Sequence, residues 1–384
     1  MNLLDQETIL ELFRAYYPYF VFSLFLGAFA LTYYMIPKVL WVSNAKQLMA
    51  SVNERSSHSV AVPTFGGVAF YLTFILILSV IQSLRLGYVG NHLIAGISIL
   101  FMVGLKDDLV ISTARVKLFG QLAAACFIVF SPELQLTNLY GFWGIYGIPA
   151  FIGYGLIALL IVALINAYNL IDGIDGLAAI TGIVIAAVYG AIFYITGLPY
   201  YVLVCVSLAG ILTAFLPFNF SRGRRKIFMG DSGSLVIGFI LAFLTIKILV
   251  MEPEVSLFAQ NYLPANRLLF IATVLFVPVF DTLRVMILRL VKRQSPFTAD
   301  RNHAHHVLLD LGFSHPKASL CLATLNILVI SIYVAFSNFM SHMWLSFLVV
   351  SLYAGSFLVF FLLKGKAALV ARSGHRTQHF RDVA

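Results

Sequence analysis

The sequence predicts an all-α protein, a polytopic integral membrane bundle of about eleven transmembrane helices. Its composition supports this class, because 61% of the 384 residues are hydrophobic and only 11% are charged. A soluble domain has about half apolar and about a quarter charged residues, whereas the mean hydropathy here is +0.94. Apolar runs of about 20 residues, the length that crosses a bilayer, recur along the chain. No low-complexity tract or convincing repeat interrupts them, so a single membrane domain over residues 1–384 accounts for the chain.

Eleven apolar runs qualify as spans, although the third and fourth are short. The segment before the first run is acidic, with Glu7 and Glu11, whereas a cleavable signal peptide begins with positive charge. We therefore expect the first span to stay as an anchor. In chain order, the predicted spans are residues 16–36, 64–84, 93–105, 118–130, 148–167, 177–195, 200–218, 234–250, 268–290, 318–336 and 343–363.

The basic residues gather in alternate connections between these spans and in the C-terminal segment. Of the 25 Lys and Arg residues, 19 lie there and two more, Arg284 and Arg289, lie toward the end of the ninth span; the other four are Arg14, Arg85, Lys247 and Arg267. By the positive-inside rule these connections face the cytoplasm, so the N-terminus is external and the C-terminus cytoplasmic. The net charge of +9 is then a topology signal, and we expect no nucleic-acid partner. The predicted cytoplasmic loops are residues 37–63, 105–117, 167–177, 218–233 and 291–317.

The third of these loops places two carboxylates and two glycines between apolar runs, within residues 169–177. A carboxylate left in hydrocarbon costs about 2.5–3.5 kcal/mol, and no Lys or Arg lies in the same turn as Asp172 and Asp175. Gly173 and Gly176 allow the backbone to approach a ligand closely. We interpret the loop as a site for a cation and a phosphate-bearing molecule, with an ordinary connecting turn as the alternative.

The second loop carries adjacent carboxylates at Asp107 and Asp108, followed by Lys117. Two charges a few ångströms apart repel by about 4 kcal/mol at an effective dielectric of about 20. These carboxylates therefore favour a shared cation or a basic partner, and a solvated pair at a helix end is the alternative. The first loop contains His58 and ends in Pro63-Thr64-Phe65-Gly66-Gly67, a motif that a simple helix start also explains.

The fourth loop combines Asn219, a basic run from Arg222 to Lys226, and Gly230-Asp231-Ser232-Gly233-Ser234 at the start of a helix. Asp and Ser are favoured N-cap residues, but glycine and free backbone donors at a helix N-terminus also form an anion site. Both interpretations stay open. The basic run is interpreted as a topogenic or lipid-headgroup patch.

The fifth loop places three imidazoles within four residues beside an arginine: Arg301, His303, His305 and His306. Histidine is a common zinc ligand, but no cysteine or complete carboxylate–histidine set accompanies this cluster. Recognition of a pyrophosphate or a sugar therefore suits it better. Upstream, Asp281 and Arg284 are three residues apart inside the ninth span, a spacing that favours a structural ion pair.

Five carboxylates from three predicted cytoplasmic loops imply a bound Mg²⁺, with Mn²⁺ as the alternative. Oxygen ligands suit hard cations, and Mg²⁺ is typically held by one or two carboxylates plus substrate phosphates. Imidazoles and basic groups beside such a cation suit phosphoryl transfer, in which catalysis is mostly positioning and charge neutralisation. The five carboxylates are Asp107, Asp108, Asp172, Asp175 and Asp231.

In this order, the motifs resemble those of the polyprenyl-phosphate N-acetylhexosamine-1-phosphate transferases. The resemblance covers nearly the whole chain and rests on residues 63–67, Asp107-Asp108, residues 169–176, Phe228-Met229-Gly230-Asp231 with Ser234, and residues 300–306. It implies a Mg²⁺-dependent enzyme of the bacterial inner (plasma) membrane. Such an enzyme transfers a sugar-1-phosphate from a UDP-N-acetylhexosamine to a polyprenyl phosphate, such as undecaprenyl phosphate. UMP is released, and the product starts the synthesis of a cell-envelope polysaccharide.

The resemblance also implies roles for individual residues. Asp231 is the expected metal ligand, with Asp108 as a second one, and Asp107 and Asp108 lie by the lipid phosphate. That phosphate is largely deprotonated at pH 7, so base catalysis is not the expected main contribution. Lys117 is a candidate partner for the lipid phosphate. The expected substrate-binding residues are His58, Asn169, Asp172, Asp175 and Asn219. The catalytic contacts to diphosphate and sugar are expected from Arg301, His303, His305 and His306.

The sequence of the fifth loop also bears on the sugar donor. The muramoyl-pentapeptide branch of this family carries consecutive histidines ending in Phe-Glu, whereas this chain has Asp300-Arg301-Asn302-His303-Ala304-His305-His306. That difference favours UDP-N-acetylglucosamine as donor, with UDP-N-acetylmuramoyl-pentapeptide as the alternative.

Two rival functions come from other classes of membrane protein. One is a transporter of nucleotide sugars or metal ions, whose polar groups would lie near the membrane midplane. The other is a metal-dependent membrane phosphatase, which would have no evident use for a nucleotide pocket. For the assembly, we consider a homodimer.

Overall fold

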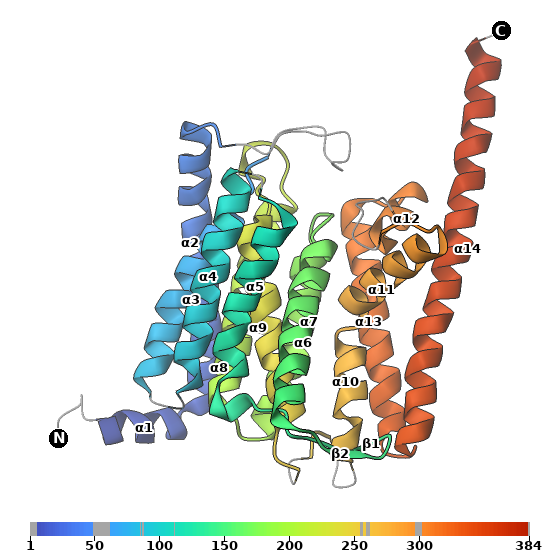
Figure 1. Cartoon of the computed structure of the whole chain (residues 1–384). Helices are drawn as coiled ribbons and strands as arrows, with labels where there is room; N and C mark the ends of the chain where they lie inside the picture. The colour runs from blue at the N-terminus through green and yellow to red at the C-terminus, as the bar shows by residue number, and fades with distance from the viewer. Residues whose placement is uncertain are drawn as a thin grey trace.

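The computed structural model is a bundle of long, roughly parallel helices (Figure 1). It describes residues 6–48, 62–84, 86, 88–110, 112–253, 256–258, 262–295 and 302–382. The α-helices are α1 Gln6–Ala15, α2 Tyr17–Ala45, α3 Gly66–Ser83, α4 Val89–Leu109, α5 Ala114–Val129, α6 Ala150–Ile171, α7 Leu177–Ile195, α8 Pro199–Asn219, α9 Gly230–Val250, α10 Arg267–Val274, α11 Phe276–Val291, α12 Ala304–Asp310, α13 His315–Ser337 and α14 His342–Asp382. The two described strands, β1 Asn138–Phe142 and β2 Ile145–Gly147, form an antiparallel hairpin.

Nine helices in the described part of the chain are long and apolar enough to cross a membrane. They are α2, α3, α4, α6, α7, α8, α9, α13 and α14. The bent pair α10 and α11 makes a tenth crossing if it counts as one span. α5 occupies a predicted span but has only 16 residues. The all-α polytopic class is therefore confirmed, while the count of eleven and the sidedness of the termini stay predictions.

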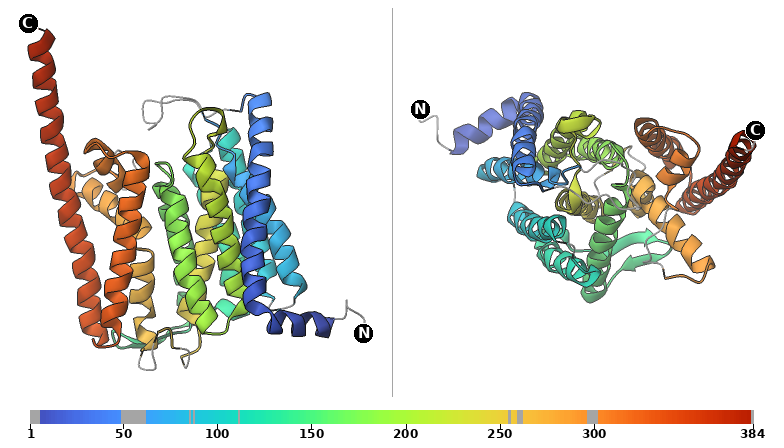
Figure 2. Two further views of the ribbon diagram at one scale, coloured as in Figure 1. Left: turned by 180° about the vertical axis from the view of Figure 1, so that it is seen from behind. Right: turned by 90° about the horizontal axis from the view of Figure 1, so that it is seen from above.

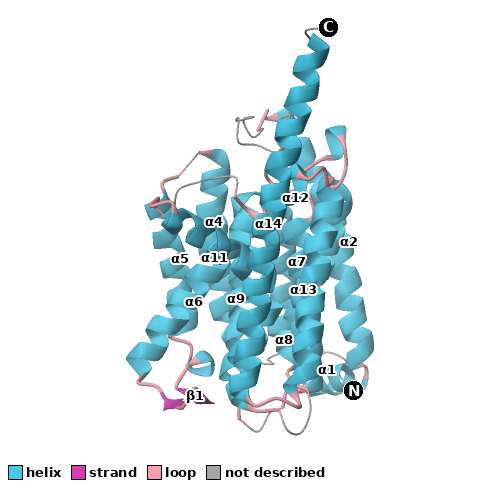
Figure 3. Cartoon of the chain, turned by 90° about the vertical axis from the view of Figure 1, so that its right-hand side faces the viewer, coloured by secondary structure: helices cyan, strands magenta, loops and turns pink. Residues whose placement is uncertain are grey.

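One end of the bundle collects the connections that the sequence marks as functional. α4, α6 and α8 end there, and α5, α7 and α9 begin there. We call this the polar end, and it is the upper end in Figure 1. α12 lies at the same end, whereas α1 and the β1–β2 hairpin lie at the opposite end (Figure 3). Three of the predicted loops, residues 105–117, 167–177 and 218–233, thus meet at one end of the molecule.

α9 is the central helix of the bundle. It packs against α3, α4, α6, α7 and α10, and 89% of its most apolar 18-residue window is buried. A helix that is apolar on all sides is expected to be buried all round, and the view from above shows the other helices around it (Figure 2). The first turn of α9, which contains Asp231, therefore emerges at the centre of the polar end.

The prediction of a continuous ninth span over residues 268–290 is wrong. The chain breaks at Leu275 into α10 and α11, which are bent by 74° relative to each other. Pro278 has no N–H to bond the carbonyl of Val274, four residues earlier, so a regular helix cannot continue through this point. α10 to α14 form a group at one side of the bundle (Figure 1), which contacts the other helices through α11 on α6, α13 on α7 and α10 on α9.

Candidate active site

The carboxylate of Asp108, at the end of α4, binds the first turn of α9. One oxygen accepts a hydrogen bond from the Asp231 N–H at 2.8 Å. The other accepts from the Ser232 N–H at 3.0 Å and from the Ser232 hydroxyl at 2.6 Å. Backbone donors at a helix N-terminus have no partner within the helix, and a side-chain acceptor satisfies them. The cap of α9 thus comes from α4, and it holds Asp231 in a defined position.

The Pro63–Gly67 motif holds the chain that leads into α9. The carbonyl of Pro63 accepts from the Phe228 N–H at 2.9 Å, and Gly66 N–H donates to the Phe228 carbonyl at 3.0 Å. The Gly67 N–H donates to the carbonyl of Met229 at 2.9 Å. This motif begins a helix, as one interpretation of the sequence expected, but its backbone also fixes the residues that precede Asp231.

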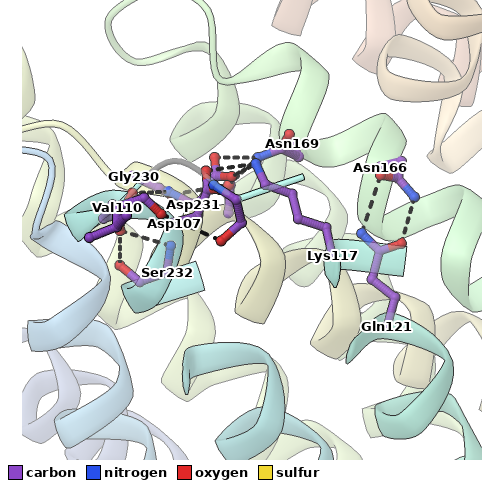
Figure 4. A network of polar contacts seen from close by, with 12 residues as sticks. Asp107, Val110, Lys117, Gln121, Asn166, Asn169, Gly230, Asp231 and Ser232 are labelled. Atoms are coloured by element: carbon purple, nitrogen blue, oxygen red, sulfur yellow. Dashed lines mark hydrogen bonds and ion pairs between the residues drawn. The ribbon is translucent and has the colours of Figure 1, made fainter. Parts of the chain in front are cut away.

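A lysine ammonium links carboxylates from two helices beside this cap (Figure 4). Lys117, in the first turn of α5, forms ion pairs with Asp107 at 2.8 Å and with Asp231. The Asn169 amide, from the last turn of α6, donates to Asp231 Oδ1 at 3.0 Å and to the Ser234 hydroxyl at 2.7 Å. Three helices, α4, α5 and α6, therefore place polar groups around Asp231 of α9. Carboxylates that would otherwise repel each other share a cation here.

A reciprocal amide pair holds α5 against α6 one turn away from this network (Figure 4). Asn166 Nδ2 donates to Gln121 Oε1 at 2.8 Å, and Gln121 Nε2 donates to Asn166 Oδ1 at 3.2 Å. Gln121 follows Lys117 by four residues and Asn166 precedes Asn169 by three, so each pair shares a helix face. Sequence reasoning missed Asn166, whose only signal is a single amide inside an apolar run.

The third loop follows α6 directly and lies beside the same carboxylates. Burial raises the pKa of Asp172 well above its usual range, and the nearby carboxylates of Asp231 and Asp108 raise it further. The loop ends at Gly176 with φ +81°, a conformation that glycine adopts without steric cost. A Cβ at this position would overlap the ring of Phe220. The loop is therefore tightly packed, and a bound cation would offset the repulsion among these carboxylates.

Asp175 joins the third loop to two other parts of the chain. Its Oδ2 pairs with Lys226 Nζ at 2.6 Å and with His315 Nδ1 at 3.2 Å. Its backbone carbonyl accepts a hydrogen bond from the Ser319 hydroxyl at 2.7 Å. Lys226 belongs to the basic run that was interpreted as a topogenic or lipid-headgroup patch, and this member of the run has a partner within the protein. These contacts place Asp175 as a link between the third loop, the fourth loop and α13.

Asn219, at the end of α8, joins the third and fourth loops through their backbones. Its Oδ1 accepts from the Gly176 N–H at 2.6 Å, and its Nδ2 donates to the Ile227 carbonyl at 3.1 Å. The side chain is buried. Both ends of the amide are thus bound to protein, which assigns Asn219 a positioning role for the loops around it.

Replacing Asn219 by Leu is expected to lower the free energy of unfolding by about 2–4 kcal/mol, because each buried backbone group left without a partner costs about 1–3 kcal/mol. The thermal midpoint of the detergent-purified protein measures this loss. Asn338→Leu, at an exposed position at the end of α13, is the matched control and should leave the midpoint unchanged. Equal midpoints for the two variants would contradict the positioning role of Asn219.

Asp281, in α11, holds the start of residues 302–306, which we call the histidine segment. Its carboxylate lies 2.7 Å from His303 Nδ1 and accepts from the Ala304 N–H at 2.6 Å. One turn later, the guanidinium of Arg284 donates to the carbonyl of Asn302. The sequence favoured a structural pair between Asp281 and Arg284, and it did not anticipate that both side chains bind residues 302–304. Their partners follow from the position of α12 in space.

The His305 ring lies between the histidine segment and the third loop. Its centroid is 5.5 Å from that of His303 and 4.3 Å from that of His306. A Cβ added to Gly173 would lie 2.5 Å from His305 Nε2, so the two segments are in contact. Burial lowers the pKa of His305 to about 3, so its imidazole is neutral at pH 7. A neutral imidazole offers one donor and one acceptor to a polar ligand.

The structure therefore brings most of the predicted site residues into one continuous cluster at the polar end. Among the residues described, no group of three or more Asp, Glu, His or Cys is arranged to hold a metal ion by itself. The donor set still fits Mg²⁺, which takes one or two carboxylates and completes its shell with water and phosphate. Asp107 and Asp231 already converge on a cation, the Lys117 ammonium. His58 and Arg301 lie outside the described residues, and their roles stay predictions.

Comparison with known proteins agrees with the motifs. A family model described as glycosyl transferase family 4 matches residues 91–249. The chain is 31% identical over 316 residues to a decaprenyl-phosphate N-acetylglucosaminephosphotransferase of Mycobacterium tuberculosis, and the match covers 77% of this chain and 78% of that protein. It is 27% identical over 293 residues to an undecaprenyl-phosphate alpha-N-acetylglucosaminyl 1-phosphate transferase of Escherichia coli, with 74% and 75% covered. The Salmonella typhi protein of the same name is 27% identical over 276 residues, with 71% of each chain covered.

Proposed function

Because the chain belongs to the polyprenyl-phosphate N-acetylhexosamine-1-phosphate transferases, we propose that it transfers N-acetylglucosamine-1-phosphate to a polyprenyl phosphate in the membrane. Its relatives are named for this transfer to decaprenyl phosphate or undecaprenyl phosphate. The donor in our proposal is UDP-N-acetylglucosamine. The product is a polyprenyl-diphospho-sugar that initiates a cell-envelope polysaccharide.

In the proposed reaction, an oxygen of the lipid phosphate forms a bond to the phosphorus that carries the sugar. The bridging bond between that phosphorus and the uridine-bearing phosphate breaks, and UMP leaves with the bond electrons. Both substrates are anionic, so the site must neutralise charge as the phosphates approach each other. The lipid phosphate is already largely deprotonated at pH 7, and the proposal needs no protein base for it.

The observation that carries the proposal is the convergence of Asp107 and Asp231 on one cation at the polar end of a membrane bundle. We propose that Asp231 holds Mg²⁺ with Asp107, while Lys117 turns to the lipid phosphate. Bound Mg²⁺ would neutralise the phosphates of the donor. Both oxygens of Asp108 accept from the start of α9, so in this proposal Asp108 orients Asp231, although the sequence suggested it as a second ligand.

The histidine segment is proposed to contact the diphosphate and the sugar. His303 is oriented by Asp281, and the buried His305 Nδ1 has no hydrogen-bond partner among the described residues. A buried polar atom of this kind favours a ligand that supplies the missing bond. Contact between His305 and Gly173 places the segment beside the third loop, where the nucleotide is proposed to bind.

The charge distribution supports a proposed orientation in a bacterial inner membrane. The basic residues gather at the connections of the polar end, which by the positive-inside rule would face the cytoplasm. Nucleotide sugars would then reach the site from the cytoplasm, and the polyprenyl phosphate would reach it from the lipid bilayer.

The experiment that tests the function is UMP release by the detergent-purified protein with undecaprenyl phosphate. UDP-N-acetylglucosamine, UDP-N-acetylgalactosamine and UDP-N-acetylmuramoyl-pentapeptide are compared as donors. We expect release with UDP-N-acetylglucosamine that requires the lipid phosphate, stops on addition of EDTA and returns with excess Mg²⁺. Release only with the pentapeptide donor would replace the proposed donor, and undiminished release in EDTA would contradict the metal. Absence of release with every donor, in folded protein, would contradict the transfer itself.

A further inference from the structure

The break between α10 and α11 has a specific cause and a specific compensation. Pro278 deprives the carbonyl of Val274 of its donor within the helix, since proline has no N–H. Across the break, the backbone turns by 74°. A carbonyl and an N–H left without partners inside a membrane bundle each cost several kcal/mol. Such a break persists only if a neighbouring group satisfies them.

Asn326, on α13, supplies both missing partners. Its Nδ2 donates to the Val274 carbonyl at 3.1 Å, on the α10 side of the break. Its Oδ1 accepts from the Val277 N–H at 3.0 Å, on the α11 side. The side chain is fully buried, with an exposed fraction of 0%. One amide therefore bridges the two helices and ties the angle between them to α13.

The direction of α11 determines where the histidine segment lies. Asp281 and Arg284 are four and seven residues beyond Val277 on the same helix, and both bind residues 302–304. A rotation of α11 about the break would therefore move His303 together with its carboxylate partner.

α13 also holds the third loop, from the same face that carries Asn326. Ser319 precedes Asn326 by seven residues, two helical turns, and both are fully buried. The Ser319 hydroxyl donates to the Asp175 carbonyl at 2.7 Å. One rigid helix thus contacts the loop with the acidic residues and, two turns away, the break that directs the histidines.

We propose that Asn326 is a positioning residue for the transfer reaction, which sets the histidine segment against the third loop through the angle between α10 and α11. The part of this proposal that is tested by kcat/KM rests on the proposed function. In this proposal Asn326 does not contact substrate, because both ends of its buried amide bind the backbone at the break, and it acts through α11 and Asp281. A side chain that only filled space at the break would not influence the histidine segment.

The first test is Asn326→Leu, which removes both hydrogen bonds and leaves a side chain of similar volume at the break. We expect kcat/KM for UDP-N-acetylglucosamine to fall about tenfold to a hundredfold, because small misplacements of reacting groups have effects of this size. Hydrogen–deuterium exchange of the peptide over residues 302–310 should become faster, while exchange in α9 stays unchanged. Wild-type kcat/KM with unchanged exchange over residues 302–310 would overturn the proposal.

A double variant separates positioning from stability. Pro278→Ala restores an N–H donor for the Val274 carbonyl and permits a straight helix. The double variant Asn326→Leu/Pro278→Ala should therefore have a thermal midpoint close to that of the wild type. Its turnover should stay below that of the wild type. Recovery of turnover together with the midpoint would overturn the proposal, because Asn326 would then serve only to satisfy the break. This comparison holds even if Asn326→Leu alone fails to fold.

The matched control is Ser331→Ala on the same helix. Ser331 is exposed, and its hydroxyl bonds the Ile327 carbonyl within α13, so this variant should keep wild-type turnover and exchange. The exchange measurement does not depend on activity. If the wild type released no UMP, the proposed function would fail, while faster exchange over residues 302–310 in Asn326→Leu would still support the coupling.

Discussion

Asp231→Asn is expected to lower turnover by about 10²–10³-fold while leaving the fold intact. The substitution keeps the size of the side chain but removes the charge that pairs with Lys117 and, in our proposal, holds Mg²⁺. Loss of several kcal/mol of charge stabilisation in the transition state corresponds to a loss of this size. UMP release under saturating donor and lipid measures it. The Asp231 side chain is 22% exposed. The amide oxygen of Asn can still accept from Asn169, and Lys117 keeps Asp107 as a partner, so little change in thermal midpoint is expected.

The matched control is Glu133→Gln, the same carboxylate-to-amide change at an exposed position at the opposite end of the bundle. It should retain wild-type turnover. Metal binding by the two variants adds a readout that does not depend on turnover. Mn²⁺ binding, followed by paramagnetic resonance, should weaken in Asp231→Asn and not in Glu133→Gln. Near-wild-type turnover in Asp231→Asn would remove Asp231 from the proposed metal site.

His303→Ala is expected to lower turnover by about 10²-fold or more, the loss typical of removing one preorganised hydrogen-bonding group from an active site. His303 Nδ1 faces Asp281 at 2.7 Å, and a carboxylate at Nδ1 fixes the orientation and tautomer of an imidazole. In our proposal, the remaining ring nitrogen binds the diphosphate. Steady-state UMP release measures the effect, and Asp281→Asn should reproduce part of it without removing the imidazole.

His342→Ala is the control for this prediction, because His342 begins α14 at the end of the bundle opposite to the histidine segment. Its turnover should match that of the wild type. An unchanged rate in His303→Ala, in protein with a normal thermal midpoint, would mean that the imidazole only packs against its neighbours. The assignment of the histidine segment to the diphosphate and the sugar would then be abandoned.

The membrane fold could be predicted because hydropathy is a local property of the chain. Each predicted span coincides with a helix or with the bent pair α10 and α11. The break itself was missed, although Pro278 was visible in the sequence. Proline is tolerated in membrane helices when a neighbour satisfies the freed groups, and no local pattern marks Asn326 as that neighbour, 48 residues later.

The site was predictable as a set of loops but not as a set of contacts. Asp107 and Asp108 are adjacent, and nothing in the sequence distinguishes their roles. In the structure, however, Asp107 pairs with Lys117 while Asp108 caps α9. Asn219 was expected to bind substrate, and in the structure both ends of its amide have backbone partners. These outcomes depend on which helix ends meet at the polar end.

The sequence by itself determined that this chain is a membrane bundle and that its carboxylates and histidines belong to a few loops. Apolar runs, and the polar segments between them, can be recognised from neighbouring residues alone. Only the tertiary structure decided which of those groups bind one another and so hold the framework. Asp281 and Asn326 are buried polar residues within apolar helices, and burial in a bundle obliges each of them to find a partner. That partner lies on another helix, and only the packing of the helices selects it.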